Sequence, residues 1–151
     1  MAKKNKNRPV APAAPAGPSV VFRASPAFKR NFEDLARANP AIIDALARFK
    51  AAKTANPLAP ASGKDKAMVA GAPIGNAIPG IRHAHLDQDI SIFYKLSGRD
   101  PTVFKLYDIA RHADSGTGNP PKIRTQSDFA SRLQTSDRRD DFSESRKNRL
   151  Q

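Results

Sequence analysis

All three histidines of this 151-residue chain lie between Ile81 and His112, in the stretch with the clearest strand pattern. Because imidazole has a pKa near neutral pH, one histidine can accept a proton while another donates one. His83, His85 and His112 are therefore candidates for acid–base chemistry, and Asp89 follows His85 by four residues. Histidines can equally be ordinary members of a small sheet, so residue type alone leaves both interpretations open.

Alternation along two neighbouring strands predicts how the first two histidines are placed. In 81–86 alternation puts both histidines on one face with Ile81, and puts Ala84 and Leu86 on the other. In 90–96 it puts Ile90, Ile92, Tyr94 and Leu96 on one face. A three-residue loop ending at Asp89 pairs Leu86 with Ile90 and brings the apolar faces together, whereas a two-residue loop would scramble them. We therefore expect the two histidines on the sheet face away from the helices, with Asp89 at its rim.

The residues before this sheet predict a strand and a helical hairpin. Val20–Arg23 is β-branched and aromatic, as in a strand. Ser25-Pro26 and Asn39-Pro40 each combine an N-cap residue with a proline and so predict two helix starts. The second helix should end before Asn56-Pro57. The expected apolar stripes are Phe28, Phe32, Leu35 and Ala36 on the first helix, and Ile42, Ile43, Leu46 and Phe49 on the second.

Residues 55–80 show no convincing periodicity and are expected to be a long loop, which includes the charged cluster Lys64-Asp65-Lys66. Ser97–Pro101 predicts a turn, and Val103–Ala110 predicts a central strand because both of its faces are apolar. Simple alternation divides that strand into Phe104 and Leu106 on one face and Val103, Tyr107 and Ile109 on the other.

Composition bounds the remaining parts of the chain. Residues 1–19 are basic and rich in alanine and proline, and 122–151 are polar, so both are expected to be mostly disordered, with at most a short helix around Asp128–Leu133. The domain is then 20–121, which is itself basic, with fourteen Lys and Arg against nine Asp and Glu. This positive charge favours a polyanionic or acidic partner.

The chain has no cysteine, which excludes disulfides and thiolate metal sites. No apolar run approaches the roughly 20 residues of a membrane span, and prolines interrupt the amino-terminal region where a signal peptide would have its apolar core. These features predict a soluble cytoplasmic protein with no membrane partner.

The residues around the histidines resemble the RelE/ParE toxin superfamily, and in particular its YafQ-like branch of bacterial toxin–antitoxin ribonucleases. The likeness is carried by Arg82-His83-Ala84-His85, Asp89, the strand Ile92–Leu96 and His112. It covers about residues 20–116 and is most specific in the histidine region. The resemblance implies an α+β domain of order β-α-α-β-β-β, with a mostly antiparallel sheet and a two-helix hairpin on one face.

The resemblance also implies an activity and partners. The protein would be the toxin of a type II toxin–antitoxin system, a ribosome-dependent messenger RNA endonuclease held inactive by an acidic antitoxin. The ribose 2′-hydroxyl would attack the adjacent phosphate, a reaction that requires no metal or other cofactor. His112 would be the general acid, and His85 and Asp89 would supply the base or its orienting partner, in an order that the sequence leaves open. The expected phosphate contacts are Lys66, Arg82 and Arg111, although alternation directs Arg82 toward the helix face.

This chain departs from the branch at two positions. Lys66 stands where a histidine would fall, and Gly116 stands where the branch has an aromatic residue. His83 has no counterpart in the motif. These departures leave open an inactive superfamily member that binds RNA or a protein partner. A ParE-like toxin that poisons DNA gyrase is a second alternative, although it needs no histidine pair.

Overall fold

The computed structural model describes residues 20–61, 64–99 and 101–144, and the expected basic arm 1–19 lies outside these ranges. The elements are β2 (Val20–Ala24), α1 (Pro26–Ala38), α2 (Ala41–Ala55), β3 (Asp65–Ala67), α3 (Pro73–Ala77), β4 (Arg82–His85), β5 (Ile90–Arg99), β6 (Thr102–Arg111), α4 (His112–Ser115) and α5 (Ile123–Arg139). They form one five-stranded sheet of order β2-β6-β5-β4-β3, in which β2 runs parallel to β6 and the other pairs are antiparallel. The predicted α+β class is confirmed. None of the described helices is long and apolar enough to cross a membrane.

The amino-terminal helices begin close to where their capping residues predict. The Ser25 hydroxyl caps α1 by accepting a hydrogen bond from the backbone N–H of Phe28 at 3.0 Å. Pro40, and not Asn39, is the residue directly before α2. The Asn39 side-chain oxygen still accepts a hydrogen bond from the N–H of Ala41 at 3.3 Å, so it serves the same helix end from one residue further out.

The hairpin of β4 and β5 has the predicted register. His85 pairs with Ser91, and the N–H of Leu86 donates to the carbonyl of Ile90 at 2.8 Å. The three-residue loop is therefore confirmed. β5 extends to Arg99, so the turn that follows it is shorter than predicted.

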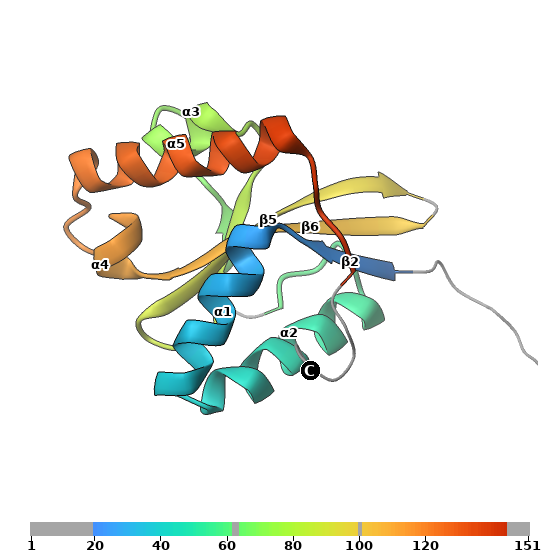
Figure 1. Ribbon diagram of the computed structural model, residues 1–151. Coiled ribbons are helices and arrows are strands. Elements are labelled where there is room, and N and C mark those ends of the chain that lie inside the picture. The colour runs from blue at the N-terminus through green and yellow to red at the C-terminus, as the bar shows by residue number, and fades with distance from the viewer. Residues whose placement is uncertain (1–19, 62–63, 100, 145–151) are drawn as a thin grey trace, which may run out of the picture.

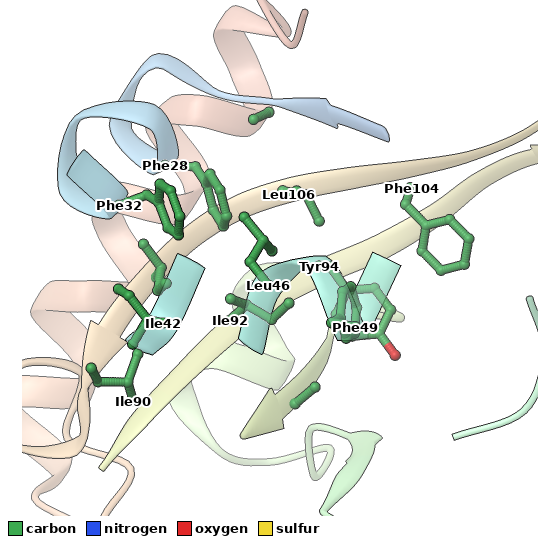
Figure 2. Close-up of a cluster of buried hydrophobic side chains, with 13 residues drawn as sticks. Phe28, Phe32, Ile42, Leu46, Phe49, Ile90, Ile92, Tyr94, Phe104 and Leu106 are labelled. Carbon is green, nitrogen blue, oxygen red and sulfur yellow. The ribbon is translucent and has the colours of Figure 1, made fainter. Parts of the chain in front are cut away.

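The helices α1 and α2 cover one face of the sheet, as predicted (Figure 1). Their apolar stripes pack against alternate residues of β4, β5 and β6, and Figure 2 shows this core. Burying one such leucine, isoleucine or phenylalanine stabilises the fold by about 1.5–3 kcal/mol. The buried members of this core include Phe28, Phe32, Ile42, Leu46, Phe49, Ala84, Ile92, Tyr94, Phe104 and Leu106.

The opposite face is partly covered by α3, which was not predicted, and by α5, of which only a short helix around Asp128–Leu133 was predicted (Figure 1). The expectation of a mostly disordered segment from 122 is wrong for 123–139, which form α5. Likewise, 55–80 contain β3 and α3. The stretch 55–80 gives no periodic signal because prolines and glycines interrupt it, and the apolar residues of α5 are few among polar ones. This second core consists of Ile74, Ile78, Ile81, Phe93, Tyr107, Ala110, Phe129, Ala130 and Leu133.

A bulge in β6 changes the faces that simple alternation predicts. The register between β5 and β6 shifts, leaving Tyr107 as an extra residue between the paired Leu106 and Asp108. Ile109 consequently joins Leu106 in the core under α1 and α2, whereas Tyr107 belongs to the second core. The placement of Ile109 with Tyr107 is therefore corrected.

An ion pair between Lys53 and Asp65 is buried beneath α2. Its Nζ–Oδ2 distance is 2.6 Å, and the two side chains are 2% and 0% exposed. The Tyr94 hydroxyl donates to the other carboxylate oxygen, and the Ala61 N–H donates to Oδ2 at 2.7 Å. Burial alone would raise the pKa of Asp65, but these hydrogen bonds and the Lys53 charge outweigh it, so the pKa is lowered.

Replacing Asp65 by asparagine should lower the free energy of unfolding by about 3–5 kcal/mol, because it leaves the Lys53 ammonium buried without its counter-charge. Urea denaturation at pH 7 measures this loss. Since the pKa of folded Asp65 is lowered, its contribution is present above about pH 4 and is lost as the pH falls through the folded pKa.

The matched control is Asp140→Asn, which removes the exposed partner of Lys105. That change should cost less than about 1 kcal/mol. Equal losses in the free energy of unfolding for the two variants would contradict the greater importance of the buried pair for the fold.

Candidate active site

The fold gathers the three histidines into one cluster. The ring centroids of His85 and His112 lie 4.8 Å apart, and those of His83 and His85 lie 5.8 Å apart. The first two histidines come from β4, and His112 opens α4 directly after β6. His83 stacks on Phe93 at 6.2 Å, and Phe93 belongs to the second core, so the cluster adjoins the face covered by α3 and α5. The structure thus places His83 beside the two histidines that the resemblance assigns to the site.

Ser91 is a further member of the site that the sequence analysis missed. It is the cross-strand partner of His85, and its Oγ lies 3.4 Å from Nε2 of His112. Its side chain therefore lies beside His112, on the sheet face that carries His85. The signal was present, because the predicted pairing of Leu86 with Ile90 also places Ser91 opposite His85.

Asp89 fixes the junction between β6 and α4. The backbone N–H of His112 donates to the Asp89 carbonyl at 2.9 Å and to its carboxylate at 3.3 Å. The same carboxylate pairs with Arg111 at 3.6 Å. In this geometry Asp89 positions the His112 backbone, which favours an orienting role over that of the base.

The three predicted phosphate contacts lie in different places. Lys66 is exposed on β3 directly across the ladder from His83, and Arg111 lies at the rim beside Asp89. Arg82 is directed to the other face, where it donates to the Tyr94 hydroxyl and the Asp65 carbonyl at 3.1 Å each. The expectation that Arg82 contacts phosphate is therefore corrected, because strand alternation turns it into the buried network.

The environment of the cluster keeps its first two imidazoles neutral. Burial, with the nearby charges of His85, Lys66 and His112, lowers the pKa of His83 to about 4. Burial also lowers the pKa of His85, with the charges of His112, Lys64 and Lys66 acting in the same direction. A neutral imidazole can accept a proton, and the positive field that keeps it neutral also attracts a phosphate.

Within the described residues, Nδ1 of His83 is buried and has no hydrogen-bond partner. A buried acceptor without a partner costs less than a buried N–H without one. This favours the tautomer with the proton on Nε2, which would make His83 a neutral hydrogen-bond donor at the edge of the cluster. No group of three or more His, Asp or Glu side chains in the described ranges is arranged to hold a metal ion.

The packing of α5 explains the glycine at position 116. Gly116 ends α4 with φ of +76°, a left-handed conformation that suits glycine. A Cβ at this position would lie 2.5 Å from the backbone nitrogen of Gln126 and 2.6 Å from the carbonyl oxygen of Lys122. The start of α5 thus excludes any side chain at this position, including the aromatic residue that the YafQ-like motif would have.

No protein family and no curated protein matches the sequence of the chain. Among solved structures, it is similar to a YoeB/ParE toxin from Agrobacterium tumefaciens, with 13% identity, a TM-score of 0.48, and coverage of 62% of this chain and 98% of that one. It is also similar to the E. coli DinJ–YafQ complex, with 22% identity, a TM-score of 0.45, and coverage of 64% and 96%. E. coli YafQ itself gives 20% identity, a TM-score of 0.46, and the same coverage.

These proteins are toxins of the kind that the motif around His85 and His112 resembles. At such identities and TM-scores the likeness is one of fold, and it carries no argument about the activity of this chain.

We expect His83 to stay neutral throughout the physiological pH range, since burial and neighbouring positive charges disfavour its protonation. An NMR titration of the three imidazoles should show its pKa close to 4, well below that of a free histidine. Native stability should correspondingly fall as the pH drops from about 6.5 toward that value, because the unfolded state takes up the proton first. A His83 resonance that titrates near pH 6.5 would contradict this description of the cluster.

Proposed function

We propose that this chain is a toxin of a toxin–antitoxin system and acts as a ribosome-dependent messenger RNA endonuclease. The observation that carries the proposal is the cluster of three imidazoles, with His85 and His112 at 4.8 Å between centroids. Lys66 and Arg111 add positive charge beside the cluster. Two acid–base groups next to cations are what phosphodiester cleavage by a ribose hydroxyl requires.

The reaction assigns one proton transfer to each of two histidines. Neutral His85 removes the proton of the 2′-hydroxyl while O2′ forms a bond to phosphorus. The bond from phosphorus to O5′ breaks, and protonated His112 donates its proton to that leaving oxygen. The products are a 2′,3′-cyclic phosphate and a 5′-hydroxyl, and exchange with solvent restores both histidines.

His83 and Lys66 stabilise the phosphate as its charge grows. Lys66 lies across the ladder from His83 and contributes a full positive charge. Neutral His83, which carries its proton on Nε2, donates a hydrogen bond without a change of charge. In this way β3 and β4 together supply the groups that the family resemblance would have assigned to a histidine at position 66.

The partner that fits this function is an acidic antitoxin, since the folded domain is basic and a similar toxin is known in complex with DinJ. The ribosome would present the messenger RNA to the histidine cluster. An antitoxin bound over the cluster would block the access of both the ribosome and the messenger RNA.

Replacing His85 and His112 by alanine, singly and together, should abolish cleavage and growth arrest, because the reaction loses its base or its acid. We expect each single variant to lower the rate by at least about 10²-fold. Induction in cells without antitoxin, followed by mapping of messenger RNA ends, measures both effects.

Gln88→Ala is the matched control, because Gln88 is an exposed residue of the loop between β4 and β5, three residues after His85. It should arrest growth like the unmodified chain. A double histidine variant that stays toxic would contradict the proposal. Arrest with intact messages and DNA-damage signalling would instead favour gyrase poisoning.

His83→Phe should lower the cleavage rate about tenfold or more, since it removes a donor to the phosphate while keeping a ring to stack on Phe93. The pH dependence of cleavage should keep its shape, because His83 is neutral over the whole range. Rates measured from pH 5 to 9 test both statements. A shifted ascending limb would show that His83, and not His85, is the base.

A further inference from the structure

A second charged feature lies between α1 and α5 and has none of the three histidines in its lining. Figure 1 shows the two helices. It is a hollow of about 210 Å³ that residues of both helices line. Its polar lining consists of Arg30 from α1, Arg132, Thr135, Ser136 and Arg139 from α5, and Asp141.

The α5 residues of this lining form one stripe of the helix. Arg132, Thr135, Ser136 and Arg139 follow the spacing i, i+3, i+4 and i+7. A stripe directed at a neighbouring helix is ordinarily apolar, and α5 does use Phe129 and other apolar residues to pack on the sheet. The stripe toward α1 is polar and basic. Arg132 also lies over the Phe129 ring at 5.2 Å, but no such internal contact accounts for Arg139 among the described residues.

The charges around the hollow favour an anion. Three guanidinium groups face one exposed carboxylate, that of Asp141. A second carboxylate, Asp108, is buried below and accepts a hydrogen bond from Asn31 at 2.8 Å. Burial raises the pKa of Asp108, while the charges of Arg132 and Arg30 act against that rise. These carboxylates offset only part of the positive charge.

The chemistry of the lining suits phosphate. Guanidinium groups form paired hydrogen bonds with phosphate oxygens, and the Ser136 hydroxyl is a polar group of the kind that commonly accompanies them, whereas the Thr135 hydroxyl donates to the Ser131 carbonyl at 3.2 Å. A neighbouring cavity of about 310 Å³ shares Arg132 but is lined by Asp34 and Asp114. The anion-binding surface therefore ends at Arg132.

We infer that this arginine-lined hollow binds the phosphodiester backbone of single-stranded RNA at a place separate from the histidine cluster. The identity of the polyanion as RNA rests on the proposed function, whereas the anion site rests on the lining itself. Such a site would hold RNA, without regard to sequence, while another part of the strand reaches the histidines.

Binding of a fluorescein-labelled 2′-O-methyl oligoribonucleotide tests the inference. This probe lacks the attacking hydroxyl, so the protein cannot cleave it. The double variant Arg132→Gln/Arg139→Gln should bind it about tenfold more weakly, and the slope of log K against log salt should fall by about 1.4, or 0.7 for each lost contact. Thermal unfolding should show that the variant remains folded.

The matched control is the double variant Arg124→Gln/Arg138→Gln, which removes the same two charges from exposed positions of the same helix outside the hollow. It should bind RNA nearly as well as the unmodified chain. Equal binding by Arg132→Gln/Arg139→Gln and by this control would overturn the inference. So would loss of binding to a polyglutamate peptide with RNA binding unchanged, since that result would assign the hollow to an acidic protein.

The outcome is independent of catalysis. The variant His85→Ala/His112→Ala should still bind the probe through the hollow. If that variant cleaves RNA normally, the proposed function is wrong, but the binding comparison between the arginine variants still decides the inference.

Discussion

The ion pair of Lys53 and Asp65 is the interaction on which the rest of the site depends. It joins α2 to the edge strand β3 across 2.6 Å. The Lys53 ammonium also lies within 5.3–5.9 Å of the ring centroids of Phe49, Tyr94 and Phe104. A buried pair of this kind adds little net stability but strongly opposes any arrangement that separates the charges. It therefore fixes the position of β3 relative to α2.

The two faces of β3 have different roles, since one belongs to the core and the other to the candidate site. Asp65 points into the core, so its neighbour Lys66 emerges on the opposite face, across from His83. The same alternation operates on β4, where Arg82 joins the buried network and His83 joins the cluster. The candidate site thus lies on the face of the sheet opposite to the buried ion-pair network.

Much of this could be predicted from local patterns. The pairing of Leu86 with Ile90 followed from matching apolar faces, and it places Ser91 opposite His85 as well. Lys53 continues the α2 stripe of Phe49 by one helical turn, which is a sequence signal for its burial. Its charge hid that signal, because a lysine near a helix end is ordinarily solvated.

The missed elements depend on tertiary contacts. α5 has a narrow apolar stripe of Phe129, Ala130 and Leu133 among charged residues, so its stability comes from packing on the sheet. The bulge at Tyr107 cannot be seen in alternation alone. The requirement for glycine at position 116 follows only from the close approach of the α5 backbone.

The chemistry of the cut ends tests the central claim most directly. Purified protein is incubated with ribosomes carrying a single message, and the termini of the products are identified. Acid–base catalysis by His85 and His112 predicts 2′,3′-cyclic phosphate and 5′-hydroxyl termini. Products with 5′-phosphate and 3′-hydroxyl termini would contradict the account, because they require attack by water and not by the ribose.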